Sequence, residues 1–166
     1  MNSLLYRRGT IDDLFQLKNL GIASYTEFSK ILTDENWKIM NNNLHNEDRL
    51  TDIITRSKIF VCETNNTLVG MAYLLLSGNP TNIYPADWSY IRMVGVSPGY
   101  RNMGIGKKLT GMCIGMAIEK GEKIIGLHTS EVMDAARHVY ESLGFRIFKG
   151  IEPLYGVKYW VYKRDL

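Results

Sequence analysis

Residues 94–109 constrain the fold most, because they pass from a strand through a glycine-bearing turn into a helix without interruption. The run Trp88 to Val96 predicts a strand, which Ser97-Pro98-Gly99 stops. A helix is predicted over 105–120, with its apolar side chains on one stripe: Leu109, Met112, Cys113, Met116 and Ala117. Free N–H groups and the helix dipole make an anion site at such a helix start, although a plain turn before a helix has the same pattern.

Two well-known phosphate-binding loops do not match this segment. Gly104 and Gly106 lack side chains, so the backbone can approach a phosphate closely, and Arg101 adds positive charge. A Walker A loop requires glycine where Arg101 stands and a hydroxyl residue where Lys108 stands. A dinucleotide-binding fingerprint requires a third glycine in place of Leu109. The sequence therefore argues against ATP hydrolysis and NAD binding.

The remaining segments predict an α+β domain built on one largely antiparallel sheet. Further strands are predicted at 4–8, 59–64, 67–76, 124–129, 145–149 and 157–164, and helical regions at 10–28, 33–57 (with a break) and 134–143. Asn65-Asn66 predicts a tight hairpin, because asparagine tolerates positive φ. The segment 150–157 carries Pro153 and Gly156 and predicts a loop.

Composition indicates one globular domain over residues 1–166. The chain has 45% hydrophobic and 22% charged residues and a net charge of +3. The positive excess lies in residues 101–166, which either favours an anionic ligand or is ordinary surface scatter. No RNA-binding motif accompanies it, so direct nucleic-acid binding is not expected.

The cysteines and the apolar runs indicate where the protein is located and whether it binds a metal. Cys62 and Cys113 lie far apart in apolar runs and predict buried, reduced thiols. Neither has zinc-ligand spacing to a histidine, so no metal is expected. The apolar N-terminal stretch is too short for a signal peptide, and no run is long enough to span a membrane. We therefore expect a soluble, cytoplasmic protein.

Two segments resemble the motifs of one enzyme family. Arg101-Asn102-Met103-Gly104-Ile105-Gly106 resembles motif A of the GCN5-related N-acetyltransferase (GNAT) family, Arg/Gln-x-x-Gly-x-Gly/Ala. Downstream, 136–145 resembles the family's motif B, Ala-x-x-x-Tyr-x-x-x-Gly-Phe. The opening, Tyr6-Arg7-Arg8 followed by Asp12-Asp13-Leu14, and the order of elements are also similar. The resemblance implies the GNAT fold, a mixed, mostly antiparallel sheet flanked by helices.

This resemblance implies an N-acetyltransferase that moves the acetyl group of acetyl-CoA to a primary amine in a ternary complex. Backbone groups of Val94 and Val96 would pair with the pantetheine arm, with the Val94 N–H directed at the thioester carbonyl. The pyrophosphate of acetyl-CoA would be held by the Arg101 side chain and by the amides of Asn102, Met103, Gly104, Ile105, Gly106 and Lys107. Ala136 would leave room for pantetheine. Tyr140 would protonate the leaving thiolate, although a tyrosine on an apolar helix face is also typical of a core.

The chain departs from the family pattern at two positions. Tyr90 stands where many members have an acidic residue that deprotonates the amine, and Met133 stands where motif B often has asparagine. The proton acceptor is therefore open among Glu27, Asp87, Glu131 and water. The missing acid also leaves open a non-catalytic acyl-CoA-binding sensor of the same fold.

The acceptor is expected between the first two helical regions and the segment 150–157. Aromatic residues there, Tyr25, Phe28, Trp37 and Tyr155, can sandwich an amine or pack against each other. A polyamine, an amino acid, an aminoglycoside and a protein N-terminus all remain open. The aromatic C-terminal strand, with Tyr159, Trp160 and Tyr162, suggests a homodimer interface, although burial of one face within the chain explains half of these residues.

Overall fold

The structure, a computed structural model, describes residues 2–166 and contains one seven-stranded mixed sheet. The strands run in the order β1-β2-β3-β4-β5-β7-β6, and all neighbours are antiparallel except β4 and β5. The strands are β1 (Leu5–Arg8), β2 (Lys58–Thr64), β3 (Thr67–Leu75), β4 (Ser89–Val96), β5 (Ile124–Ser130), β6 (Arg146–Leu154) and β7 (Val157–Asp165). The α+β class and the largely antiparallel sheet are confirmed.

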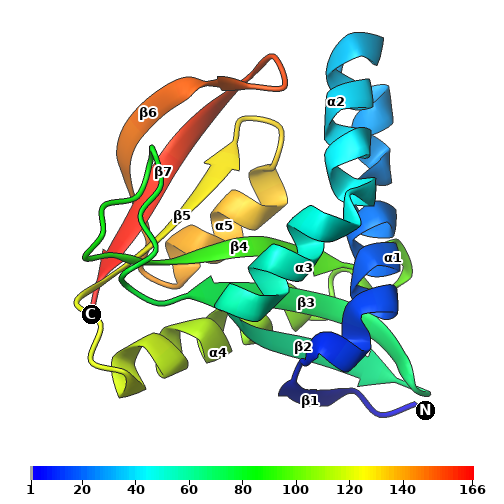
Figure 1. Ribbon diagram of the computed structural model, residues 1–166, viewed down its shortest axis with the longest axis horizontal. Coiled ribbons are helices and arrows are strands. Elements are labelled where there is room, and N and C mark those ends of the chain that lie inside the picture. Colours follow the sequence, from blue (N-terminus) through cyan, green and yellow to red (C-terminus); the bar gives the residue numbers. More distant parts are fainter. Residues whose placement is uncertain (1) are drawn as a thin grey trace.

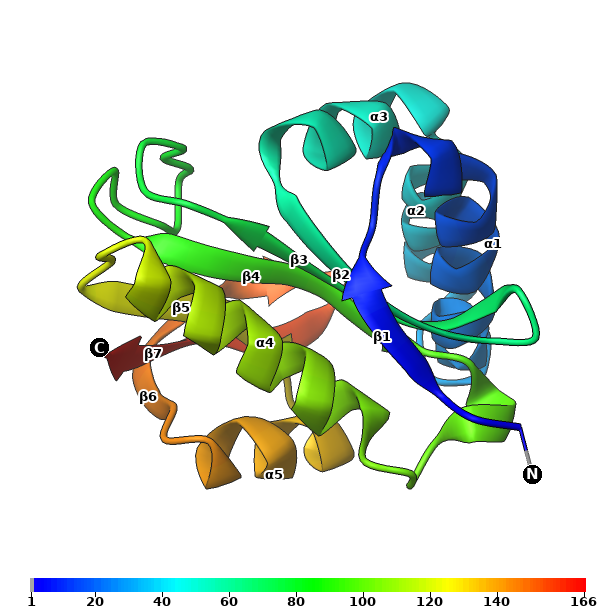
Figure 2. The same cartoon turned by 90° about the horizontal axis from the view of Figure 1, so that it is seen from below.

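Within residues 2–166, five α-helices flank this sheet (Figure 1). They are α1 (Leu14–Tyr25), α2 (Asp34–His45), α3 (Glu47–Arg56), α4 (Ile105–Glu119) and α5 (Asp134–Ser142), with short 3-10 turns at η1 (Ile11–Asp13), η2 (Thr26–Lys30) and η3 (Pro98–Tyr100). Figure 2 shows α4 and α5 on one face of the sheet and α1 to α3 on the other. The sheet is therefore covered on both sides, and two apolar clusters form its core.

Local sequence signals explain where the helices begin. Thr10 caps the first helical region, and Asp13 completes a capping box by accepting from the Thr10 N–H at 2.9 Å. The expected break in the second region falls at Asn46, whose side chain accepts from the Arg49 N–H at 3.0 Å. That region is consequently two helices, α2 and α3, rather than one.

The Asn65-Asn66 hairpin is confirmed, since φ is 49° at Asn65 and 61° at Asn66. The predicted loop over 150–157 is wrong. Strand β6 continues to Leu154, and only Tyr155 and Gly156 form the turn, with φ of 52° and 74°. Pro153 is tolerated because β6 is the edge strand of the sheet and its pairing with β7 is irregular between Ile151 and Leu154.

The aromatic strand β7 lies inside the sheet, between β5 and β6. Tyr159, Val161 and Tyr162 are buried, and Trp160 is half-buried against the core cluster under α4 and α5. Both faces of this strand are thus covered within the chain, so its aromatic residues do not by themselves require a partner subunit.

Both cysteines are buried free thiols, as predicted, and burial raises the pKa of each. Within residues 2–166, no helix is both long enough and apolar enough to cross a membrane.

Candidate functional site

The site begins where two parallel strands separate. Strands β4 and β5 pair only at Ser89 with Ile125 and at Tyr90 with Gly126, and then diverge toward their C-terminal ends (Figure 1). From residue 91 onward, the edge of β4 that faces β5 pairs with no strand among residues 2–166. An unpaired strand edge offers N–H and C=O groups to an extended ligand.

A bulge in β4 lies beside this opening. Met93 has φ of 56°, and the register against β3 shifts between Tyr73–Arg92 and Met71–Gly95. A positive φ is uncommon for methionine, and bulges near functional sites re-aim the strand. The bulge thus directly precedes Val94, which is the residue predicted to contact the thioester.

A cavity of about 710 Å³ occupies the divergence. Every predicted site residue lines it except Met103: Val94, Val96, Arg101, Asn102, Gly104, Ile105, Gly106, Lys107, Ala136 and Tyr140. Met103 is 54% exposed on the surface of the turn. Residues of α1, α2 and β5 line the cavity as well, so it extends from the start of α4 to the opposite face of the sheet.

The start of α4 contributes a row of backbone donors. Gly104 has φ of 78°, a left-handed conformation that favours glycine, and the first helical hydrogen bond runs from the Lys108 N–H to the Gly104 carbonyl. None of the N–H groups of 101–107 donates to a backbone carbonyl within residues 2–166. A Cβ on Gly106 would approach Val96 no closer than 3.8 Å, so the space before it is free of protein. Unpaired N–H groups at the start of a helix are the feature that an anion site requires.

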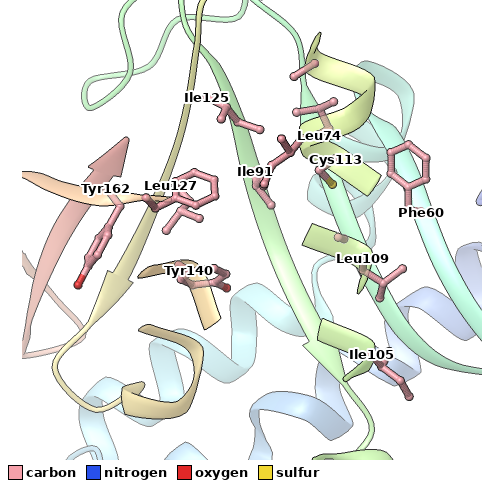
Figure 3. Packing of buried hydrophobic residues seen from close by; sticks show 14 of the residues in the cluster. Phe60, Leu74, Ile91, Ile105, Leu109, Cys113, Ile125, Leu127, Tyr140 and Tyr162 are labelled. Carbon is pink, nitrogen blue, oxygen red and sulfur yellow. The ribbon is translucent and has the colours of Figure 1, made fainter. Parts of the chain in front are cut away.

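Close packing holds this helix start in place. A Cβ on Gly70 of β3 would lie 2.5 Å from a methyl of Ile105 and 2.9 Å from one of Leu109. Helix α4 therefore sits directly on β3, and Figure 3 shows Ile105, Leu109 and Cys113 directed at the sheet.

Tyr140 projects from α5 into the gap between β4 and β5 (Figure 3). Its side chain is buried, its ring meets the edge of Phe145 at 6.2 Å between centroids, and burial raises the pKa of its phenol. Its hydroxyl has no hydrogen-bond partner among residues 2–166, in contrast to the hydroxyls of Tyr90 and Tyr162. The hydroxyl is therefore free to contact a ligand.

Arg101 makes contacts that the sequence did not predict. Its guanidinium donates to Glu27 Oε2 at 2.7 Å and to the Ser24 carbonyl at 2.9 Å, which joins the turn before α4 to the end of α1 and to η2. Glu27 is the one proposed proton acceptor that lines the cavity. Asp87 is exposed outside the cavity lining, and Glu131 is exposed and accepts from the Lys158 N–H at 3.1 Å.

The two positions that depart from the family pattern have structural roles. Tyr90 is buried, stacks on Tyr84 with ring centroids 4.2 Å apart, and donates to the Asn79 carbonyl at 2.8 Å. Met133 precedes α5, and its sulfur accepts from the Thr129 hydroxyl at 3.4 Å.

Among the polar residues of the cavity that sequence reasoning missed are Arg92 on β4 and His128 on β5. The His128 Nδ1 lies 2.7 Å from the Tyr84 hydroxyl. Burial, followed by the nearby positive charge of Arg92, lowers the pKa of His128 to about 4, so its ring is neutral at physiological pH. The sequence does contain a signal for both residues, because each is a single charged or titratable residue within an apolar strand.

Comparison with solved structures supports the same fold. The PaiA N-acetyltransferase of Thermoplasma acidophilum, solved with coenzyme A, has a TM-score of 0.80 at 17% identity and covers 99% of each chain. A GNAT-family acetyltransferase of Staphylococcus aureus Mu50 has a TM-score of 0.71 at 20% identity, again over 99% of each chain. The ribosomal-protein-S18-alanine N-acetyltransferase of Escherichia coli has a TM-score of 0.66 at 16% identity, over 98% of this chain and 94% of its own.

No curated protein matches the sequence. The model of the acetyltransferase (GNAT) family matches residues 22–145, which include the divergent strands, the start of α4 and Tyr140. On this match and the shared fold, the chain belongs to the GNAT family of acetyltransferases.

Proposed function

We propose that this chain, as a single catalytic domain, transfers the acetyl group of acetyl-CoA to a primary amine by direct attack in a ternary complex. The row of unpaired N–H groups at 101–107 carries the proposal, because it lines the same cavity as the open edge of β4. Anion-binding amides next to an unpaired strand edge suit a molecule that has both a pyrophosphate and an extended amide-bearing arm.

The chain's own groups divide the work. The amides of 102–107 and Lys107 would bind the pyrophosphate, while Val94 and Val96 would hold the pantetheine arm as an added strand. Acetyl-CoA, when bound, supplies the thioester carbon that accepts the amine nitrogen. The Val94 N–H would stabilise the negative charge that develops on the carbonyl oxygen. Holding the two reactants together removes much of the entropic barrier.

Two protons must move for the reaction to balance. As the new C–N bond forms and the C–S bond breaks, Tyr140 would give its phenolic proton to the sulfur. The attacking nitrogen would lose its proton to water or to Glu27, the cavity carboxylate that Arg101 holds at 2.7 Å. Tyr140 would be reprotonated from solvent before the next turnover.

Release of free CoA thiol from acetyl-CoA, measured with a panel of amines, tests this proposal. We expect amine-dependent thiol release together with an N-acetylated product identified by mass spectrometry. If the protein bound acetyl-CoA tightly in calorimetry but released no thiol with any amine, the enzymatic proposal would be wrong. That result would instead support a non-catalytic acyl-CoA sensor, which the tyrosine at position 90 leaves open.

A further inference from the structure

Arg92 is a cation without a partner inside the cavity. It lies on β4 two residues after Tyr90, lines the cavity and is partly buried. The ion pairs of residues 2–166 use other cations: Arg7, Lys18, Arg56, Arg101, Arg137 and Lys163. Within the described part of the chain, its guanidinium makes no side-chain hydrogen bond, and the Tyr84 and Tyr90 hydroxyls are bonded to His128 and to the Asn79 carbonyl. A partly desolvated guanidinium with five unpaired donors is unfavourable unless a ligand completes its pairing.

The groups that face Arg92 do not neutralise it. Its charge acts on Tyr25, Tyr84 and His128, lowering the pKa that each would otherwise have. Burial raises the pKa of both tyrosines overall and lowers that of His128, so all three groups are uncharged at neutral pH. The positive charge of Arg92 therefore stands alone in this part of the cavity.

The other charges of the cavity do not favour a polycation. Lys18 and Arg49 add two cations on the side of α1 and α3. The two lining carboxylates are Glu27, which is paired with Arg101, and Asp134, an exposed residue 3.7 Å from Arg137. A polyamine or aminoglycoside would meet more positive than free negative charge on entering.

Apolar and aromatic side chains complete the surroundings. Tyr25, Phe28, Met40 and Leu44 line the cavity on the side of α1 and α2, and Tyr159 lines it from β7. The Tyr25 and Phe28 rings lie 5.8 Å apart between centroids, and Phe28 packs with Met40 in one apolar cluster. A ligand that pairs with Arg92 would thus place the rest of its body against an apolar wall.

Arg92 also lies close to the predicted point of acetyl transfer. It precedes Val94 by two residues, with only the bulge residue Met93 between them, and both residues line the same cavity. One small molecule can therefore contact the guanidinium with one group and present an amine near Val94 with another. The carboxylate and the amine of a free amino acid are separated by a single carbon atom, which suits this short spacing.

We propose that the acceptor is a free amino acid with an apolar or aromatic side chain, whose carboxylate forms a charge-assisted pair with Arg92. This inference rests on the proposed acetyl transfer and narrows its acceptor. A guanidinium binds a carboxylate through two parallel N–H···O bonds, which fixes orientation as well as position. Arg92 is thus a specificity-determining residue, because it selects and orients the amine.

The test compares matched acceptors that differ only in the carboxylate, such as phenylalanine with phenethylamine and leucine with isopentylamine. For each enzyme variant, the ratio of kcat/KM between the acid and its decarboxylated partner is measured. Comparing this ratio between variants cancels the intrinsic reactivity of each amine. We expect Arg92→Met to lower the ratio about a hundredfold and Arg92→Lys to lower it less, since lysine keeps the charge but not the fork.

Arg56→Met is the matched control, because Arg56 lies outside the cavity and pairs with Asp52 at 2.9 Å. It should leave the ratio unchanged. A ratio that stayed the same in folded Arg92→Met, or a wild-type preference for spermidine over every amino acid, would overturn the inference.

Binding separates this inference from the acetyl-transfer proposal itself. Calorimetry measures phenylalanine binding to the CoA-saturated protein, without any turnover. Binding that is lost in Arg92→Met supports the carboxylate site even if no acetylated product forms, in which case only the catalytic proposal fails. If amines are acetylated equally well with and without Arg92, the acetyl-transfer proposal holds and the carboxylate site is refuted.

Discussion

Tyr140 combines burial with a hydroxyl that has no protein partner among residues 2–166. Because burial raises its pKa, the phenol keeps its proton throughout the physiological range. The same desolvation would disfavour a bare thiolate beside it, so a sulfur that leaves in this site needs a proton. These properties suit a proton donor rather than a base.

We therefore expect Tyr140→Phe to lower kcat by about 10²–10³, the range of a lost general acid. The ring and its packing against Phe145 are retained, so acetyl-CoA affinity should change no more than a few-fold. Steady-state kinetics and calorimetry measure the two quantities. Tyr73→Phe removes another buried hydroxyl outside the cavity and should leave turnover intact. Wild-type turnover in Tyr140→Phe would show that the phenol is structural.

At the scale of single residues, motif-bearing positions were the predictable ones. Gly104, Gly106 and Tyr140 stand at fixed spacings, and all three line the cavity. Arg92 is the one charged residue in the run 88–96. Its lack of an ion-pair partner could not be predicted, because it depends on residues distant in the sequence. The positive φ of Met93 had no signal, because methionine does not favour that conformation.

At the scale of elements, the start of α4 gives a sharp prediction. Gly106→Glu should abolish CoA binding while the protein stays folded, because the carboxylate would fill and repel the pyrophosphate site. The fold should tolerate the side chain, since the nearest atom to a Cβ there is 3.8 Å away. Gly115→Glu places the same residue at an exposed position of the same helix, with no atom within 4 Å of its Cβ, and should bind normally. Calorimetry showing unchanged CoA affinity in folded Gly106→Glu would refute the phosphate site.

A cluster of charged side chains connects strand β1 to the turn before α1 and to β2. The Arg7 guanidinium donates to Asp13 at 2.8 Å and 3.0 Å and to Glu63 at 3.0 Å and 3.2 Å. Asp13 is nearly buried and also accepts from the Thr10 N–H, and hydrogen bonding to Arg7 lowers its pKa. A carboxyl whose folded-state pKa is depressed stabilises the fold above its unfolded pKa of about 3.9.

Asp13→Asn should accordingly lower the free energy of unfolding at pH 7 by about 1–3 kcal/mol, the range of a hydrogen bond to a charged group. The difference from wild type should shrink as pH falls below about 4 and the wild-type carboxyl is itself protonated. Urea unfolding at pH 7 and pH 3 measures both values. A gap of equal size at the two pH values would mean that the ionised carboxylate adds nothing.

Element types followed from local sequence wherever the determinant was itself local. The capping box at Thr10, the Asn65-Asn66 turn and the stripe of α4 depend on neighbouring residues only. The end of strand β6 could not be predicted from local sequence. Gly150 and Pro153 are typical of a loop, and only the pairing of β6 with β7 shows that the strand continues through them. Edge position decides whether a proline can stay in a strand.

At the scale of the whole molecule, the decisive feature is the divergence of β4 from β5, which no sequence pattern announced. It is defined by long-range relations: pairing that stops after Tyr90, a bulge at Met93 and Tyr140 reaching in from α5. The two halves of the sheet, β1 to β4 and β5 to β7, are thus joined where β4 and β5 begin and separated by the cavity where these strands end. Binding in that cavity should therefore stabilise the molecule as one unit.

Saturation with CoA should raise the melting temperature in proportion to the logarithm of its concentration. At a hundredfold excess over Kd, linkage gives about 2.7 kcal/mol, which corresponds to roughly 5–10 °C for a chain of this size. Hydrogen exchange should slow at the amides of 94–96 and 101–107, where the ligand supplies the missing acceptors. Gly106→Glu should lose both effects, and Gly115→Glu should keep them. Protection confined to α1 and α2, with none at the start of α4, would place CoA elsewhere and contradict the arrangement proposed for the whole site.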